Sequence, residues 1–247
     1  MSSSDDAVQA RLKALAERMK QAAARAGRGA AEVTLVAVSK TFPAPAVVAL
    51  ARCGQRDFGE SYVQEALVKI AAVRAAVDLP LAWHFIGPIQ SNKTRPIAEH
   101  FDWVQSVDRL KIAERLSEQR PAHLPPLNVL LQVNISGEPS KSGVAPADVA
   151  ALARAVAALP RLRLRGLMAI PEPEDDPQRQ RPPLAAMKRL FDALRAGGFA
   201  GWDTLSMGMS ADLETAIEEG TTMVRVGTAL FGARPARQRA PEDARQP

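Results

Sequence analysis

Lys40 ends an apolar stretch that has the composition of a buried strand, VTLVAVSK over residues 33–40, and Pro43 follows three residues later. Arginine is the commoner cation of this chain, but it cannot give up its proton, whereas a desolvated lysine amine can. A neutral amine at the end of a strand can form a Schiff base with an aldehyde. The alternative is a lysine whose stem packs on apolar surface while its charge reaches solvent.

The segment VRVGTALFG, residues 224–232, places a second cation inside an apolar stretch. Arg225 lies two residues before Gly227, and Gly227 and Thr228 are expected to open a short final helix. Backbone N–H groups at the start of such a helix, together with a hydroxyl, form a cradle for phosphate. Ser210 is expected to start the preceding helix and to add its hydroxyl to the cradle; its alternative role is that of an ordinary N-cap.

These features together indicate a phosphorylated aldehyde as the ligand. A lysine amine for the carbonyl, a cradle for the phosphate and an interior arginine match pyridoxal 5′-phosphate. Arg225 would donate to the pyridine nitrogen and keep its own proton, so the ring would be a weak electron sink, suited to holding the cofactor or to limited proton chemistry. Asp212 and Glu214 count against the phosphate site because they bring negative charge near it.

Eight strand-like segments, separated by helical patterns, must position these residues. Their alternation predicts a parallel sheet, and eight repeats within 247 residues predict a single closed (β/α)8 TIM barrel over residues 1–232, with an extra N-terminal helix at 5–26. The runner-up is an open flavodoxin-like sheet. Residues 171–183 are predicted to form a Pro-rich acidic loop, and residues 233–247 a disordered basic tail. The strands are expected at about 33–39, 56–60, 81–87, 101–107, 127–135, 162–170, 202–207 and 222–227.

Chemistry in such barrels lies at the carboxyl ends of the strands. We expect that end to receive His84 from the third strand, Met168 from the sixth and Ser206 from the seventh, and we count all three as candidate cofactor-binding residues beside Lys40. Glu60, after the second strand, is the one acid/base carboxylate among the positions expected there.

Composition argues against several function classes. The net charge is +5, but the arginines are scattered among acids and aromatic residues make up only 4% of the chain, so we expect no nucleic-acid partner. Apolar runs are too short for a membrane span, and the N-terminus lacks the pattern of a secretory signal. The lone cysteine, Cys53, favours a reducing compartment, so we expect a cytoplasmic protein. The three histidines lack metal-ligand spacing, and no metal is expected.

Seven motifs between Val33 and Gly232 together resemble the pyridoxal phosphate homeostasis protein family, whose fold is that of the alanine racemase N-terminal domain. They are AVSKT, FGESYVQE, WHFIGPIQSNK, NISGEPSKSG, GLMAIP, LSMGMSADLETAI and MVRVGTALFG. The resemblance implies pyridoxal 5′-phosphate held covalently on Lys40, with Arg225 at the pyridine nitrogen and His84 and Met168 near the ring. It implies a phosphate site made by Ser210, Gly227 and Thr228.

The chain departs from the family at two places. Ser61 stands in FGES where the family usually has Asn, which puts a ring-side contact there in doubt, and MGMSAD replaces the usual LGMSDD. The family's role is intracellular homeostasis of the cofactor, through its supply and amino-acid balance, without established turnover. We therefore expect a monomeric carrier, with pyridoxal-phosphate-dependent apo-enzymes as candidate transient partners.

Two enzymatic alternatives stay open. A racemase-like enzyme of the same fold needs two bases on opposite faces of the cofactor. Lys40 is one, but relatives that racemise take the second, a tyrosine, from an additional C-terminal domain and a dimer partner, and the only tyrosine here is Tyr62 after the second strand. A barrel enzyme that forms a Schiff base with a phosphorylated sugar would need Glu60 as its acid/base group.

Overall fold

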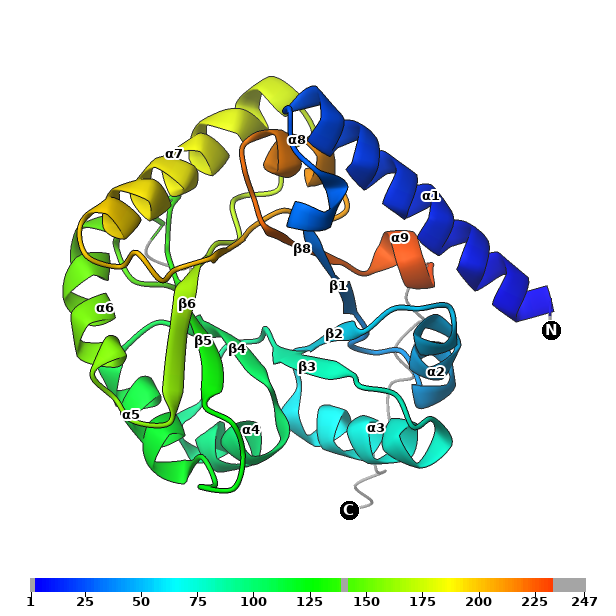
Figure 1. The fold of residues 1–247 in the computed structure, drawn as a ribbon, viewed down its shortest axis with the longest axis horizontal. Helices are drawn as coiled ribbons and strands as arrows, with labels where there is room; N and C mark the ends of the chain where they lie inside the picture. Colours follow the sequence, from blue (N-terminus) through cyan, green and yellow to red (C-terminus); the bar gives the residue numbers. More distant parts are fainter. Residues whose placement is uncertain (1–2, 139–141, 233–247) are drawn as a thin grey trace, which may run out of the picture.

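The computed structural model describes residues 3–138 and 142–232 and confirms the predicted barrel (Figure 1). Its strands are parallel and pair in chain order, and the last closes the ring against the first. They are β1 (Thr34–Val38), β2 (Asp57–Glu60), β3 (Ala82–Phe85), β4 (Trp103–Val107), β5 (Leu127–Gln132), β6 (Leu162–Met168), β7 (Thr204–Ser206) and β8 (Met223–Val226). The predicted tail, residues 233–247, lies outside the described residues.

Helices surround the barrel and alternate with its strands (Figure 1). They are α1 (Ser3–Arg25), α2 (Ala44–Arg52), α3 (Val63–Ala76), α4 (Thr94–His100), α5 (Leu110–Gln119), α6 (Val149–Ala157), α7 (Pro177–Ala196), α8 (Leu213–Glu218) and α9 (Thr228–Phe231). Short 3-10 turns lie at Ala30–Glu32, Ser91–Lys93 and Pro146–Asp148. The extra N-terminal helix is α1, which packs across α8, α9 and α2.

The loop predicted over residues 171–183 is wrong in its second half, because α7 begins at Pro177. Proline is well suited to the first turn of a helix, where its missing N–H has no partner to lose. Asp176 caps this turn, since its side chain accepts a hydrogen bond from the N–H of Gln178. Pro182 and Pro183 then lie inside the helix, although interior prolines usually break one.

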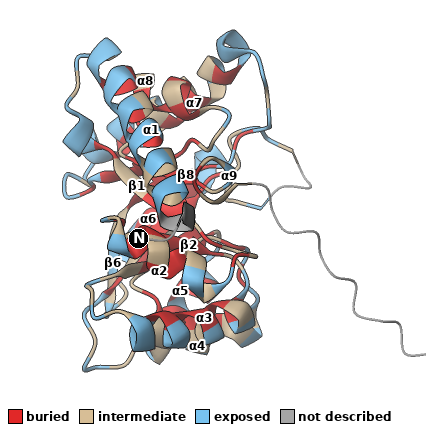
Figure 2. Cartoon of the chain, turned by 90° about the vertical axis from the view of Figure 1, so that its right-hand side faces the viewer, coloured by how far each residue is buried: buried red, intermediate tan, exposed pale blue. Residues whose placement is uncertain are grey.

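The core fills the space between the strands and the helices. Buried residues gather on the strands and on the inner sides of the helices, while the outer helix faces are exposed (Figure 2). Phe58 packs against Trp83 in this layer, with ring centroids 5.6 Å apart. Residues of the opposite strand phase, such as Arg225 and its register partner Val36, point into the barrel.

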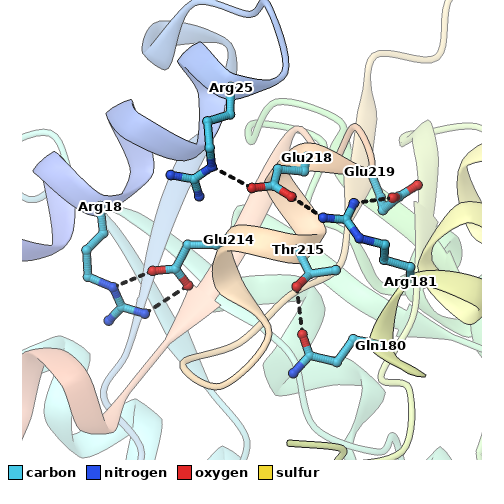
Figure 3. Close-up of polar contacts among 8 residues, drawn as sticks. All are labelled: Arg18, Arg25, Gln180, Arg181, Glu214, Thr215, Glu218 and Glu219. Atoms are coloured by element: carbon cyan, nitrogen blue, oxygen red, sulfur yellow. Dashed lines mark hydrogen bonds and ion pairs between the residues drawn. The ribbon is translucent and has the colours of Figure 1, made fainter. Parts of the chain in front are cut away.

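Ion pairs hold α8 between α1 and α7 (Figure 3). Arg18 of α1 binds Glu214 through two hydrogen bonds, of 2.7 and 3.0 Å. Glu218 accepts from Arg25 of α1 at 2.8 Å and pairs with Arg181 of α7. The loop that precedes α8 is therefore anchored through this helix to both neighbours.

The first prediction concerns the Arg18–Glu214 pair. The pKa of Glu214 lies below its ordinary value of 4.5, chiefly because Arg18 donates hydrogen bonds to the carboxylate. The ionised form thus stabilises the fold above that value, and the contribution is lost as the pH falls through the lowered folded-state pKa. Glu214→Gln should lower the stability at neutral pH by roughly 0.5–1 kcal/mol. Thermal unfolding of the wild-type protein and of the variant should show this stability deficit shrinking in acid. A deficit independent of pH contradicts a stabilising role of the ionised Glu214 carboxylate.

A second prediction concerns Gly166 in β6. Its φ is +148°, and an added Cβ would lie 2.0 Å from the carbonyl oxygen of Thr204 in the neighbouring strand. Gly166→Ala should therefore destabilise the barrel by about 1–3 kcal/mol from backbone strain, plus a similar amount from the clash. Gly201→Ala is the control, because nothing lies within 4 Å of the added Cβ there. Urea unfolding should separate the two variants, and equal midpoints would rule out the clash.

Candidate cofactor-binding site

The guanidinium of Arg225 lies inside the barrel, where the residue is only 3% exposed. Its Nη1 donates to Ser206 Oγ at 2.6 Å, and its Nη2 donates to the carbonyl oxygen of Ala169 at 2.8 Å. Burial lowers the pKa of Arg225 to about 10, which still leaves the group protonated at neutral pH. A guanidinium has five N–H groups, and these bonds engage two of them. Arg225 is thus a fixed cation that can donate to a ligand.

A chain of hydrogen bonds continues from Arg225 across the barrel interior. Ser206 Oγ donates to Gln105 Oε1 at 2.7 Å, and Gln105 Nε2 lies 3.0 Å from His84 Nδ1. An amide nitrogen only donates, so His84 Nδ1 accepts and the ring proton sits on Nε2. That nitrogen lies 2.9 Å from Asp57 Oδ1. These hydrogen bonds fix the rotamer of Ser206 and hence the orientation of Arg225.

Sequence reasoning missed Gln105 and Asp57. The available signal was a polar residue in the middle of the apolar strand WVQSV and an acid at the start of β2. The structure also shows how His84 is related to Arg225, since the hydrogen bonds connect the two through Gln105 and Ser206. In the strand register His84 pairs with Gly59, at the level of Val38.

Lys40 lies two residues beyond the end of β1 and is partly buried. Gly227, after β8, lies close to the end of β1, because an added Cβ there would be 3.3 Å from the carbonyl oxygen of Val38. The strands β1 and β8 are hydrogen-bonded neighbours. The end of β1 that carries Lys40 and the start of α9 are thus brought together, and a side chain larger than that of glycine would crowd the backbone at position 227.

The hydroxyls of Ser210 and Thr228 also converge, with Thr228 Oγ1 3.3 Å from Ser210 Oγ. The alternative of Ser210 as an N-cap is wrong, because α8 begins at Leu213 and Asp212 holds the N-cap position. The Asp212 carboxylate accepts from the backbone N–H of Met209 at 2.7 Å. Glu214, the other acid that counted against this site, is engaged by Arg18. The two carboxylates are therefore bound to partners other than the paired hydroxyls.

Met168 is the last residue of β6 and is fully buried. It pairs in register with Ser206, whose side chain points into the barrel, so both residues belong to the same strand phase. The carbonyl of the next residue, Ala169, receives the Arg225 hydrogen bond. Met168 and Ser206 thus line the barrel interior beside Arg225.

Glu60 does not join this group. Its Oε1 accepts from Ser39 Oγ at 2.6 Å and from Lys69 Nζ of α3, also at 2.6 Å. Burial raises the pKa of Glu60, although Lys69 opposes the shift. These contacts place the Glu60 carboxylate between the barrel wall and helix α3. It is therefore unavailable as the acid/base group of an enzyme that forms a Schiff base with a phosphorylated sugar.

The residues present fit a phosphorylated pyridine aldehyde. An amine, a buried donor cation and a pair of hydroxyls beside a glycine with little room for a side chain all lie at one end of the barrel. Within residues 3–138 and 142–232, no group of three or more His, Cys, Asp or Glu side chains is placed to hold a metal ion. No helix in the described ranges is both long and apolar enough to cross a membrane.

Comparisons with known proteins identify the family. The family model "Alanine racemase, N-terminal domain" matches residues 10–235. The chain is 65% identical over 220 residues to a pyridoxal phosphate homeostasis protein of Pseudomonas aeruginosa, covering 89% of this chain and 93% of that one. Identity to the protein of the same name from Escherichia coli K12 is 56% over 218 residues, covering 88% and 93% of the two chains.

A solved structure has the same fold. PipY of Synechococcus elongatus with pyridoxal phosphate (PLP) bound is 35% identical and superposes with a TM-score of 0.78, covering 91% of this chain and all of that one. Matches of this length and identity, over a closed eight-stranded barrel, define the family. The chain belongs to the alanine racemase N-terminal domain family and, within it, to the pyridoxal phosphate homeostasis proteins.

Proposed function

We propose that this chain binds pyridoxal 5′-phosphate as a Schiff base on Lys40 and serves as a non-catalytic carrier in cofactor homeostasis. The observation that carries the proposal is the buried guanidinium of Arg225, held by Ser206 and Ala169 inside the barrel. A charge is buried at a substantial cost unless it is well satisfied, and the guanidinium has N–H groups beyond these two bonds that could donate to a pyridine nitrogen. The PLP-bound neighbour PipY supports the same ligand class.

The covalent step uses the Lys40 amine. Its nitrogen lone pair adds to the aldehyde carbon, a C=N bond forms, and the carbonyl oxygen leaves as water with the two amine protons. Ser210, Gly227 and Thr228 would bind the phosphate through two hydroxyls and the backbone N–H groups at the start of α9. Met168 and Ser206 would lie beside the ring, and His84 would act through Gln105.

The carrier role rests on what Arg225 cannot do. Its pKa of about 10 keeps it protonated, so it donates to the ring nitrogen without transferring a proton. The racemase alternative needs a second base opposite Lys40. Tyr62, the only tyrosine of the chain, holds the N-cap position of α3 and is 46% exposed. Its placement favours the carrier.

We propose that the carrier works in the cytoplasm as a monomer and hands the cofactor transiently to apo-enzymes. The lone cysteine, Cys53, supports a reducing compartment. The names of the P. aeruginosa and E. coli relatives support the homeostasis role.

The third prediction tests the covalent site. Mixing the chain with pyridoxal 5′-phosphate should give an imine absorbance band, and borohydride reduction followed by peptide mapping should place the label on Lys40. Lys40→Ala should abolish the reduced adduct, because it removes the proposed Schiff-base amine, while phosphate-dependent binding is partly kept. A label on Lys93 or Lys141 in the wild-type chain contradicts the proposal.

A second arm separates carrier from racemase. The loaded chain is incubated with a panel of L-amino acids, and D-enantiomers are measured by chiral chromatography. The carrier proposal predicts no sustained turnover, because it assigns no second base opposite Lys40. Steady production of a D-amino acid that is lost in Lys40→Ala would favour the enzyme.

A further inference from the structure

Thr41, the residue directly after Lys40, has a φ of +70°. A β-branched residue in the left-handed region is a genuine outlier, and such strain persists only where the surroundings enforce it. Its side chain adds no compensation, since Thr41 Oγ1 is buried without a hydrogen-bond partner in the described structure. Something else must hold this residue.

Helix α3 supplies the restraint through two charged side chains. Glu65 Oε1 accepts from the backbone N–H of Thr41 at 2.7 Å. Lys69 Nζ donates to the carbonyl oxygen of Ser39 at 2.7 Å. These groups belong to the two peptide bonds that flank Lys40, so α3 holds the backbone on both sides of this lysine.

The restraining side chains of α3 are themselves held by hydrogen bonds. Lys69 is only 5% exposed and uses its three N–H groups on Ser39, on Glu60 at 2.6 Å and on Glu65 at 2.8 Å. The two glutamates and the lysine lie outside the barrel wall, whereas Arg225 and Ser206 lie inside it. The groups that hold the backbone around Lys40 and the groups that hold Arg225 thus lie on opposite sides of the sheet.

We infer that Glu65 is a positioning residue for the Schiff-base lysine: it holds Thr41 in the left-handed conformation and so fixes the direction in which Lys40 leaves β1. The inference rests on the proposed role of Lys40 and adds the group that orients it. Without Glu65, Thr41 relaxes to negative φ, and the amine points toward the cofactor site in only a fraction of molecules.

Glu65→Ala is the informative variant. Lys69 keeps its bonds to Glu60 and Ser39, so α3 stays anchored and no buried carboxylate loses its cation. The rate of imine formation after mixing with pyridoxal 5′-phosphate should fall by about 5- to 30-fold, the ratio that corresponds to the strain of one left-handed non-glycine residue. Glu99→Ala is the matched control, since Glu99 is also a helical acid in an i,i+4 pair with a 35% exposed side chain.

A rescue variant separates positioning from helix packing. Glycine adopts positive φ without steric cost, so Thr41→Gly in the Glu65→Ala background should recover most of the lost rate. If Glu65 served only to attach α3, glycine at position 41 would leave the slow rate unchanged. That result, or a normal rate in Glu65→Ala alone, overturns the inference.

Amide hydrogen exchange keeps this test separate from the proposed function. In the cofactor-free chain the Thr41 amide should be protected, and the protection should be lost in Glu65→Ala but kept in Glu99→Ala. Protection without any adduct on Lys40 would leave the restraint intact and refute the cofactor role. An unprotected Thr41 amide in the wild-type chain refutes the restraint.

Discussion

The site depends on keeping one positive charge inside a β-barrel. Barrel interiors of this kind are usually filled with branched apolar side chains, and an unsatisfied guanidinium there would cost several kcal/mol. Arg225 is tolerated because Ser206 and Ala169 accept its hydrogen bonds, and because Gln105 accepts the Ser206 hydroxyl proton and so leaves the oxygen lone pairs for the arginine. The hydrogen bonds then continue from Gln105 to His84 and from His84 to Asp57, so that each side chain has a partner. The polar layer is thus the condition for having a cation at this depth.

The barrel topology could be predicted from the sequence, and Lys40 and Arg225 could be singled out as candidates, because both features leave local signals. Strand-length apolar runs that alternate with helical patterns specify a parallel barrel, and a charge within such a run is conspicuous, as with Lys40 and Arg225. The start of α7 could not be predicted in this proline-rich segment, since Pro177 favours a helix start while Pro182 and Pro183 oppose a helix interior.

Partnerships across the barrel could not be predicted, because they depend on strand register. Gln105 and Ser206 meet although about a hundred positions separate them, and nothing local marks them as partners. Glu60 illustrates the same limit. It follows a strand, as Lys40 does, but its neighbour in the sheet is Ser39, one residue out of phase with the lysine. Its residue type indicated an acid/base group at the site. Its position in the alternation of side chains along β2 instead turns the Glu60 carboxylate outward to Lys69.

The two faces of the barrel wall therefore have separate tasks. The inner face presents Arg225, which is charged at neutral pH and donates without exchanging a proton. The outer face, through Glu65 and Lys69, holds the peptide groups around Lys40. If Lys40 and Arg225 hold the two ends of the ligand as proposed, a fixed cation and a lysine on a restrained backbone would favour one orientation of a rigid aromatic ring, because the fold would meet the ordering costs before binding. Under the proposed carrier function, this arrangement would let the protein hold a reactive aldehyde without consuming it.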